Sequence, residues 1–469
     1  MITSRDLMTD KKLLGSHFDA DSWNAWRALL AGFEGLPLDD AELAIWQRLT
    51  GRESAPITAA DELWLAMGRR GGKSFIAAFL AVLIACFRDH ASRLSVGEVA
   101  TVLVISADRK QARTVFRYVT GFLHSNPMLE ALISREDKES IELNNRCVIE
   151  IGTASFRSTR GYSLAAVIAD EIAFWRNEES ANPDREIINA LRPALATLNG
   201  KLIALSSPYS KKGELWEHFR RYYGQDHHSI IFAKASSKLM NPTLRDRVIE
   251  QAKERDLAAA LAEYEAEFRN DIESFIDVEV LHRASRSEPE TVPHRAGNRY
   301  FAFADPNGGG ADGYALAIGH KEKSGKVIID LVTERTRCNP ANVTEEYAGI
   351  LKRYGITRIT GDRYAGEWVS NEFRRHGIGY IFADKNRSEI YLDCLAMLNA
   401  GQIELPPNDK IIRQFQNLER RTSRVGRDTI DHPKGLHDDL ANAVAGASVV
   451  VGQKKIPLSG KDIRVRFAY

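Results

Sequence analysis

Short apolar runs alternate with helical patterns between residue 63 and about residue 207. The runs are apolar at nearly every position, which is typical of strands buried on both faces of a parallel sheet. After the first run, at residues 63–67, the clearest are residues 99–107, 146–152, 164–171 and 201–207. The alternation predicts an α/β domain with a mainly parallel sheet, preceded by a tryptophan-rich helical segment over residues 1–60.

A second pattern begins at Arg299 and predicts strand, Gly-rich turn, strand, turn and strand. A later strand-like run ends beside Asp362, and the last clear helix opens at residues 438–439. Residues 211–275 are charged and read as helical, and the proline-containing stretch 285–298 is typical of a connection between domains. We therefore expect a second, mixed α/β domain after residue 298.

Composition narrows the class of protein. A chain of 469 residues is too long for one ordinary core, so two domains are expected. A net charge of +1 gives no overall attraction for nucleic acid, so such contacts must come from local basic patches. The four cysteines are Cys86, Cys147, Cys338 and Cys394; they form no CxxC pair, which argues against a zinc ribbon or a disulfide scaffold. No long apolar span or signal peptide is found, so we expect a soluble, intracellular protein that is not secreted.

Residues 67–74, MGRRGGKS, form a turn between the first apolar run and an alanine-rich helix pattern. Strand, loop and helix in this order are the parts of a P-loop, whose backbone N–H groups, lysine and serine bind nucleotide phosphates and Mg²⁺. Met67 stands where the usual spacing has a glycine. The candidate ATP-binding residues are Gly68, Arg69, Arg70, Gly71, Gly72, Lys73 and Ser74.

The run LAAVIADE ends abruptly in two carboxylates, Asp170 and Glu171. After a P-loop, the first acid is expected to complete the Mg²⁺ shell together with Ser74. The second is expected to orient or deprotonate the attacking water. Taken with the upstream lysine loop, this pair predicts an ATPase domain.

Further carboxylates stand at element ends in the second half of the chain. Asp305 and Asp362 end strand-like runs, and Asp438 and Asp439 open the last helix. If the fold brings them together, they make an oxygen-ligand site for Mg²⁺ or Mn²⁺, and two ions there could cut a phosphodiester. This order of acids is that of RNase H-like nucleases. His437 and Asp312 are second-rank candidates.

In combination these motifs resemble those of the large subunit of tailed-bacteriophage terminases, over about residues 40–450. GRRGGKS resembles the terminase Walker A motif, VIADE Walker B, LSSPYS the coupling motif and HDDLANA the last nuclease motif. The resemblance implies adenine contact by Gln47, an arginine near the γ-phosphate at Arg69, and a trans-acting arginine at Arg160. It also leaves open which of Asp438 and Asp439 binds metal.

The resemblance implies an ASCE-type P-loop ATPase followed by an RNase H-like nuclease. The expected segments are a helical lead-in at 1–60, an ATPase core at 61–210, a helical lid at 211–284, a linker at 285–298, a nuclease at 299–452 and a basic tail at 453–469. The implied activity is ATP-driven movement of double-stranded viral DNA into a procapsid, with cutting of concatemers. The implied cofactors are ATP with Mg²⁺, and Mg²⁺ or Mn²⁺ at the nuclease site.

The implied partners are double-stranded DNA, a terminase small subunit and the portal of the procapsid, in the cytoplasm of an infected cell. We expect the protein to form a homo-oligomeric ring while it moves DNA, and a monomer is possible when it is free of its partners. No membrane partner is expected. The basic segments 410–427 and 211–223 are candidates for DNA contact. Other readings remain open: a helicase or repair ATPase with a nuclease, a defence nuclease gated by its ATPase, or a DNA-stimulated ATPase whose acidic cluster is inert.

Overall fold

The computed structural model describes residues 2–154, 162–176, 183–269, 272–306, 313–362, 366–422, 428–433 and 435–453. Internal contacts divide the chain into two compact units. Apart from residues 178–181, which lie outside the described ranges, the first unit runs to residue 270 and the second begins at residue 271.

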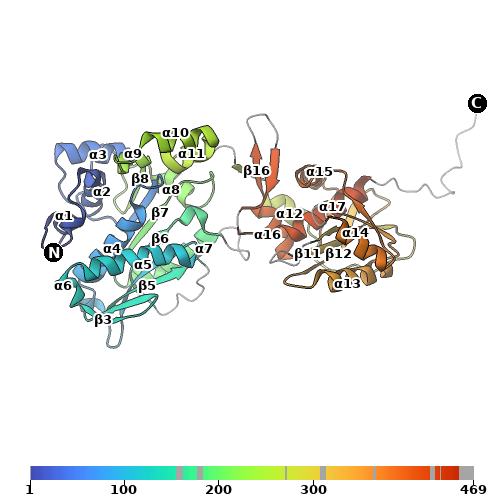
Figure 1. Ribbon diagram of the computed structural model, residues 1–469, viewed down its shortest axis with the longest axis horizontal. Coiled ribbons are helices and arrows are strands. Elements are labelled where there is room, and N and C mark those ends of the chain that lie inside the picture. The colour runs from blue at the N-terminus through green and yellow to red at the C-terminus, as the bar shows by residue number, and fades with distance from the viewer. Residues whose placement is uncertain are drawn as a thin grey trace, which may run out of the picture. The chain divides into compact units, whose positions relative to one another are not determined.

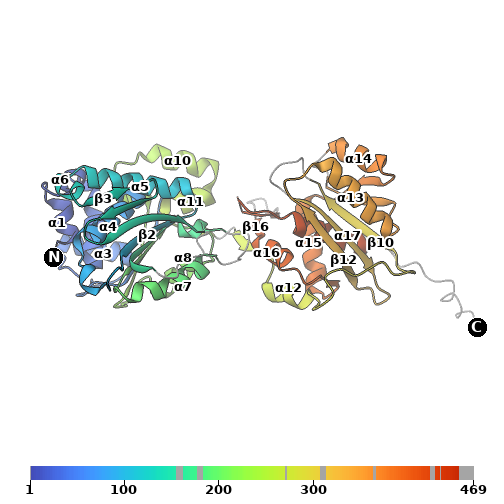
Figure 2. The same cartoon turned by 90° about the horizontal axis from the view of Figure 1, so that it is seen from below.

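The first unit is built on an eight-stranded sheet (Figures 1 and 2). In spatial order its strands are β3 (Ile133–Glu136), β4 (Ser140–Leu143), β5 (Cys147–Thr153), β2 (Ala100–Ser106), β6 (Ser163–Asp170), β7 (Lys201–Ser206), β1 (Glu62–Met67) and β8 (Ile230–Ala235). From β5 to β8 all neighbours are parallel, and the pairings of β4 with β3 and with β5 are antiparallel. The expected α/β class with a mainly parallel sheet is confirmed.

Helices cover both faces of this sheet, because the central strands are apolar on both sides. On one face, α4 (Lys73–Phe87) and α5 (Arg109–His124) pack against β2, β5 and β6. On the other, α7 (Pro183–Ala196) packs against β6, and α8 (Glu214–Tyr222) against β1 and β8. The remaining helices of the unit are α1 (Ser4–Thr9), α2 (Asn24–Phe33), α3 (Asp40–Thr50), α6 (Pro127–Glu130), α9 (Ser237–Met240), α10 (Asp246–Arg255) and α11 (Leu257–Glu265), with short 3-10 turns at Gly15–His17, Asp21–Trp23, Ala91–Arg93 and Ile172–Phe174.

The segment 211–284 differs from the expected helical lid. Its residues 230–235 form β8, which pairs in parallel with β1 over the whole length of that strand. The apolar run IIFA is short and lies between charged helical stretches, so its strand character was hidden in the sequence. Only α9 to α11 lie between this strand and the end of the unit, and α12 (Val278–Ala284) already belongs to the second unit.

The second unit holds a six-stranded mixed sheet. Its strands in spatial order are β14 (Gly379–Phe382), β13 (Arg358–Gly361), β10 (Tyr300–Asp305), β11 (Tyr314–Lys321), β12 (Val327–Arg335) and β15 (Ile403–Glu404). β10, β11 and β12 form an antiparallel meander, while β13 and β14 extend the sheet in parallel from β10. This is the mixed α/β sheet that the resemblance implied for this half of the chain.

One long helix, α17 (Asp439–Gln453), crosses β10, β11 and β12 on one face, and it packs there with α15 (Arg387–Asn399) and α16 (Asp409–Asn417) (Figure 2). The apolar residues of α13 (Pro340–Arg353) and α14 (Gly366–Arg375) cover the opposite face. A small sheet of β9 (Ile272–Ser274), β16 (Glu419–Thr422) and β17 (Asp428–Asp431) completes the unit.

The stretch 285–298, expected as a linker, is packed onto the second unit. Arg286 Nη1 donates to Ile329 O at 2.8 Å, and the backbone N–H of Val292 donates to Asp330 O at 2.7 Å. Tyr354 OH also donates to Val292 O at 2.7 Å. Polar residues and prolines therefore mark an ordered edge of the sheet here, because the backbone finds its partners on β12.

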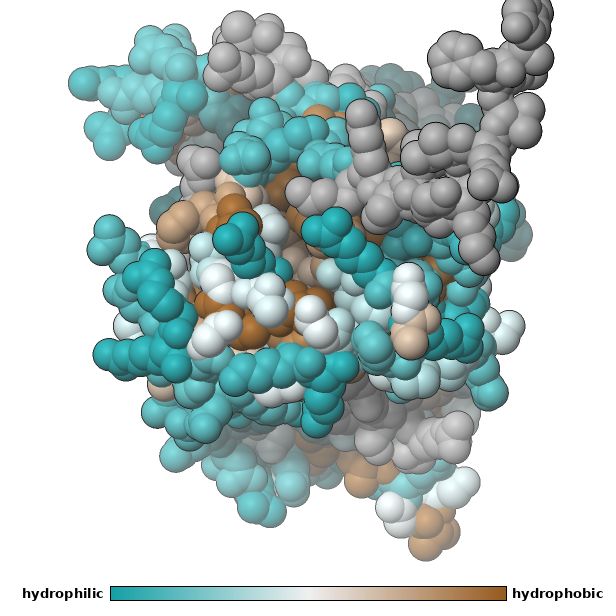
Figure 3. Space-filling view, turned by 90° about the vertical axis from the view of Figure 1, so that its right-hand side faces the viewer, coloured by the Kyte–Doolittle hydropathy of each residue, from teal (hydrophilic) through white to brown (hydrophobic). Residues whose placement is uncertain are grey.

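The face of the molecule in Figure 3 is mostly polar, with smaller apolar areas between the polar side chains. Among the described helices, none is both long and apolar enough to cross a lipid bilayer.

Candidate functional sites

Strand order brings the predicted ATPase motifs of the first unit to one edge of its sheet. β7 lies between β1 and β6, and all three run parallel, so their carboxyl ends meet. The lysine loop follows β1, the two acids end β6, and Ser206 and Ser207 end β7. The segment predicted to couple hydrolysis to movement therefore stands between the predicted phosphate loop and the predicted catalytic acid.

The loop at residues 68–72 is held by hydrogen bonds to its carbonyl groups. Trp26 Nε1 donates to Gly71 O at 2.8 Å, Ser237 Oγ to Arg69 O at 2.6 Å, and Asn241 Nδ2 to Arg70 O at 3.0 Å. Gly72 has a φ of +90°, which favours glycine, and it opens α4. With its carbonyls tied to the protein, the loop is fixed as the start of a helix, whose backbone N–H groups suit an anion.

Lys73 is 7% exposed, and its ammonium group is bound within the site. Its Nζ lies 2.9 Å from Ser207 Oγ and 3.1 Å from Met67 O, and it is 3.6 Å from Glu171 Oε1. The lysine therefore provides a positive charge beside the acid that ends β6. The contact between Lys73 and Ser207 links the lysine loop after β1 directly to the end of β7.

Glu171 adopts a left-handed backbone conformation, with φ of +51° and ψ of +43°. Such a conformation is costly for a non-glycine residue and is compensated here by two hydrogen bonds to its carboxylate. Glu171 Oε2 accepts from Ser206 Oγ at 3.0 Å and from the backbone N–H of Ser207 at 3.1 Å. The strained turn therefore aims the acid away from its strand and across the end of β7.

Asp170 is 2% exposed, and its Oδ1 accepts no hydrogen bond from any described residue. Burial, assisted by the charge of Glu171, raises the pKa of Asp170 to about 7. A buried carboxylate oxygen without a donor suits a cation, so the donor set fits Mg²⁺. Ser74, the other predicted Mg²⁺ ligand, is the second residue of α4.

In the second unit, strand pairing brings Asp305 and Asp362 together. β10 and β13 are parallel neighbours with Ala304 opposite Gly361, and the next residues along both strands are these two acids. The backbone N–H of Asp362 donates to Ala304 O at 3.2 Å, which fixes this register. Two carboxylates that are distant in the sequence therefore stand side by side at one edge of the sheet.

Asn442 contacts both acids, and it was not among the predicted residues. Its Nδ2 donates to Asp305 Oδ2 at 2.8 Å and lies 3.5 Å from Asp362 Oδ2. It lies four residues, or about one helical turn, after Asp438. That spacing is the sequence signal that could have identified it. A Cβ added at Gly446, one turn further on, would overlap the ring of Phe303 in β10. That close approach holds this part of α17 against the strand that carries Asp305.

The two acids of HDD are held by other groups of the protein. Asp438 Oδ2 accepts from Tyr391 OH at 2.7 Å, and Asp438 Oδ1 lies 3.1 Å from Arg387 Nη1. Asp439 accepts from the backbone N–H of Gly313 at 2.8 Å, and burial raises its pKa to about 6. Among the described residues, no three His, Cys, Asp or Glu side chains are grouped so as to hold a metal ion.

The four acids of the second unit nevertheless lie close enough for their charges to interact electrostatically. The pKa of Asp305 is raised well above its usual value, first by burial and then by the charges of Asp438, Asp439 and Asp362. Two carboxylates with a shared amide, and two more nearby, are an oxygen-rich set of the kind that suits Mg²⁺ or Mn²⁺.

The family comparison identifies part of the first unit. Residues 65–183, which include the lysine loop and the acids of β6, match the model of the terminase large subunit, T4likevirus-type, N-terminal. The resemblance to terminase large subunits is confirmed over this segment. No curated protein matches the chain.

Solved structures of large terminases are also similar to the chain. The large terminase of bacteriophage HK97 is 15% identical, with 91% of this chain and 99% of that chain covered and a TM-score of 0.40. The large terminase of the thermophilic bacteriophage D6E is 14% identical over 88% and 99%, with a TM-score of 0.39. The large terminase nuclease from thermophilic phage G20c is 18% identical over 34% and 85%, with a TM-score of 0.31.

Two of the predicted ATP-site residues, Arg69 and Gln47, stand apart from the lysine. Arg69 Nη2 pairs with Glu263 Oε1 of α11 at 3.1 Å, and 56% of its side chain is exposed. Gln47 Nε2 donates to Glu53 O at 2.8 Å, near Arg52, which donates to carbonyls at the start of β8. That end of α3 therefore lies where β1 and β8 begin, whereas the loop follows the end of β1, so the structure does not bring Gln47 to it. Arg160 lies outside the described residues.

The second-rank nuclease candidates are only partly described. Asp312 lies outside the described residues, and His437 immediately precedes Asp438. A different histidine, His432, approaches the site, with Nε2 3.7 Å from Asp438 Oδ1.

Some residues of the basic segments expected to contact DNA are engaged within the protein. In 410–427, Lys410 pairs with Glu334 and Arg420 with Asp428, while residues 423–427 lie outside the described ranges. In 211–223, Trp216 and Phe219 pack against Phe268. Residues 454–469 of the basic tail are outside the description.

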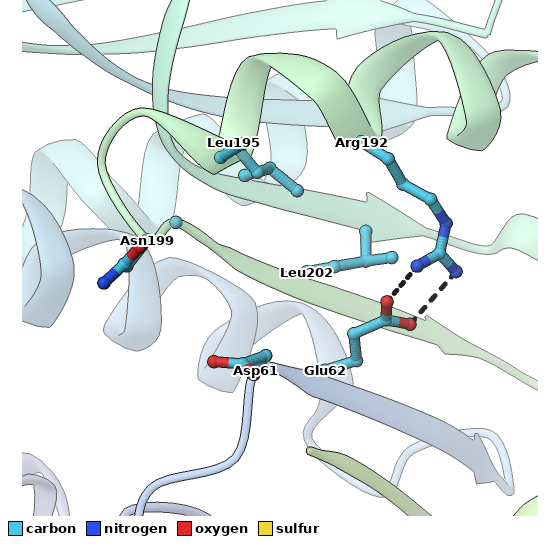
Figure 4. A pocket seen from close by; sticks show the side chains of 8 residues that line it. Asp61, Glu62, Arg192, Leu195, Asn199 and Leu202 are labelled. Atoms are coloured by element: carbon cyan, nitrogen blue, oxygen red, sulfur yellow. Dashed lines mark hydrogen bonds and ion pairs between the residues drawn. The ribbon is translucent and has the colours of Figure 1, made fainter.

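A cavity of about 380 Å³ lies at the opposite edge of the first sheet, where β1 and β7 begin (Figure 4). In the close-up, Arg192 of α7 points toward Glu62 and pairs with both of its carboxylate oxygens. Because the lysine loop is at the other end of β1, this cavity is separate from the ATPase motifs.

Proposed function

We propose that the chain is a DNA-packaging enzyme in which the first unit hydrolyses ATP to move double-stranded viral DNA into a procapsid. In the same proposal, the second unit cuts concatemeric DNA with bound Mg²⁺ or Mn²⁺. The observation that carries the proposal is the junction of Lys73, Ser207 and Glu171 at one sheet edge. Lys73 and Glu171 lie within the segment that matches the terminase family model, and Ser207 follows it in the sequence.

In the ATPase, the backbone of residues 68–72 binds the phosphates and Lys73 binds the β- and γ-phosphate oxygens. Ser74 and Asp170 hold Mg²⁺, which neutralises charge on the phosphates when bound. Lys73 has to leave Ser207 and Glu171 to reach a phosphate, because its Nζ is now bound to the loop and to Ser207. Its departure frees Glu171 to orient the attacking water. It also releases Ser207, so β7 responds to nucleotide binding.

Two arginines complete this proposal. Arg69 leaves Glu263 to approach the γ-phosphate, and Arg160 reaches the nucleotide of a neighbouring copy in a working ring. Gln47 is left out of the proposed adenine contact, because its end of α3 lies at the other edge of the sheet.

In the nuclease, Asp305 and Asp362 hold the metal, and the ion supplies a Lewis acid for the attacking and leaving oxygens when bound. Asp438 or Asp439 adds further oxygen ligands. For Asp438 this requires Arg387 to release it, which leaves the guanidinium group next to the site for a DNA phosphate.

The proposed partners are duplex DNA, a terminase small subunit and the portal of a procapsid, in the cytoplasm of an infected cell. A protein that moves along any genome is expected to contact phosphates rather than base edges, so its DNA binding should weaken steeply with salt.

A reciprocal pair of variants tests the two activities. Lys73→Ala should lower ATP hydrolysis by about a thousandfold and leave plasmid cleavage in Mn²⁺ unchanged. Asp305→Asn should abolish cleavage and spare ATP hydrolysis. Cleavage by Asp305→Asn at the wild-type rate would contradict the nuclease assignment.

Packaging is distinguished from the helicase reading by a strand-displacement assay on forked DNA. The packaging proposal expects ATP-dependent movement of duplex DNA without strand separation. Efficient displacement by the isolated chain would favour a helicase with an attached nuclease.

A further inference from the structure

We propose that Asn442 is a metal ligand of the second unit: its amide nitrogen takes the place of the cation while the site is empty, and its amide oxygen coordinates the cation when one binds. The inference rests on the proposed nuclease function, because it concerns the ion held by Asp305 and Asp362.

The first observation is the position of the amide. Asn442 is 1% exposed, and its Nδ2 reaches both Asp305 and Asp362, at 2.8 and 3.5 Å. An N–H donor between two carboxylates fills the space in which a shared cation would be most stable.

The second observation is the other atom of the same amide. Asn442 Oδ1 is buried and accepts no hydrogen bond from any described residue. A half-turn about the Cβ–Cγ bond exchanges Oδ1 and Nδ2, so that the oxygen faces the two carboxylates. The rotation gives up the two contacts of Nδ2, which the cation then replaces. An amide oxygen is an ordinary ligand for Mg²⁺ and Mn²⁺.

The third observation is that the other two acids are already satisfied. Asp438 is held by Tyr391 and Arg387, and Asp439 by the backbone of Gly313. Among the contacts described, Asn442 is the side chain that reaches both Asp305 and Asp362. Gly446 keeps α17 close to Phe303, so Asn442 cannot move far from Asp305.

The experiment measures binding of Mn²⁺ alone to the full chain, without nucleotide, by isothermal titration calorimetry. Asn442→Leu keeps the shape of the side chain but removes both polar atoms. It should weaken Mn²⁺ binding about tenfold or more. Ser448→Ala is the matched control, because Ser448 is also buried on α17 and its hydroxyl donates to Val444 O rather than to either acid. It should leave the affinity unchanged.

The sign of the change separates a ligand from a mere hydrogen-bond donor. If Asn442 only separates the two carboxylates, Asn442→Leu leaves them facing each other, and Mn²⁺ binds as tightly as before or more tightly. That result, together with loss of Mn²⁺ binding in Asp305→Asn, overturns the inference and leaves the proposed nuclease intact. Wild-type Mn²⁺ binding by Asp305→Asn overturns both.

A second variant keeps the inference testable if Asn442→Leu does not fold. Asn442→Asp places an oxygen in either rotamer, so it should bind Mn²⁺ at least tenfold more tightly than the wild type. It should also be less stable than the wild type in EDTA and regain stability when Mn²⁺ is added. Unchanged Mn²⁺ affinity in this variant contradicts the role of Asn442 as a ligand.

Discussion

Both units present acids at the carboxyl end of a buried strand, but they balance the negative charge differently. In the first unit, Lys73 lies 3.6 Å from Glu171, so the chain supplies its own cation. In the second, Asp305 and Asp362 share the neutral amide of Asn442. On the proposed functions, the first site is prepared for an anion that displaces the lysine, and the second for a cation that displaces the amide. Similar strand ends serve opposite kinds of ligand.

The largest expected effect concerns the acid that the lysine neutralises. Glu171→Gln should lower ATP hydrolysis by about a hundredfold to a thousandfold, because the amide cannot take up a proton. Ser207→Ala should have a smaller effect, about tenfold, because Lys73 keeps its contacts with the loop. Phosphate release assays measure both, and cleavage of plasmid DNA should be unchanged in each variant. Equal losses in both activities would show that the two units do not act separately.

The next largest expected effect is on stability, and it concerns the packing of α17 against β10. Gly446→Ala forces a Cβ into the ring of Phe303 and should destabilise the second unit by about 1–3 kcal/mol. Gly121→Ala in α5 is the control, because a Cβ there meets nothing within 4 Å, and it should stabilise the helix by up to about 1 kcal/mol. Calorimetric unfolding measures the two changes. A neutral Gly446→Ala would mean that α17 does not set the position of Asn442.

When metal is absent, removal of one acid should raise the free energy of unfolding in the second unit but not in the first. In EDTA, Asp305→Asn should stabilise the second unit by about 1–2 kcal/mol, because it removes the charge of one of two neighbouring carboxylates. Glu171→Gln should stabilise nothing, because it leaves the buried Lys73 without its acid. Chemical denaturation compares the two variants. Stabilisation by both would remove the distinction between the sites.

The smallest effect is expected away from both acidic edges. His218 is buried against Trp64, with ring centroids 3.6 Å apart, and burial lowers its pKa below the usual value. A lowered folded-state pKa means that the unfolded chain binds the proton more readily, so this contribution to stability is present above pH 6.5 and is lost as the pH falls through the folded-state pKa. The free energy of unfolding of His218→Phe should therefore fall less between pH 7 and pH 5 than that of the wild type. His228→Phe, at a histidine without this burial, should keep the wild-type slope.

The sequence predicted the parts of each site that lie on single elements. Lys73, Asp170 and Glu171 could be found because a buried strand followed by a specific polar end is a local pattern. The contact between Lys73 and Ser207 could not, because it depends on β7 lying between β1 and β6. Asn442 was missed for the same reason: an amide on an apolar helix gains its meaning only when β10 and β13 place two acids against it.

The prediction was least accurate at the edge strands and at the boundary between the two units. β8 is a short apolar run within a charged region, and only its pairing with β1 marks it as a strand. The stretch 285–298 has the composition of a linker but finds its hydrogen-bond partners on the second sheet. Gln47 sits in a plausible sequence context, yet α3 ends at the wrong edge of the first sheet for a nucleotide contact.

The central difference between the two units is tested most directly by anomalous diffraction from crystals soaked in Mn²⁺ without nucleotide. We expect a Mn²⁺ peak bound by Asp305, Asp362 and Asn442 Oδ1, and none beside Asp170 while Lys73 remains bound to Ser207. A peak beside Asp170 alone, or no peak between Asp305 and Asp362, would contradict the account.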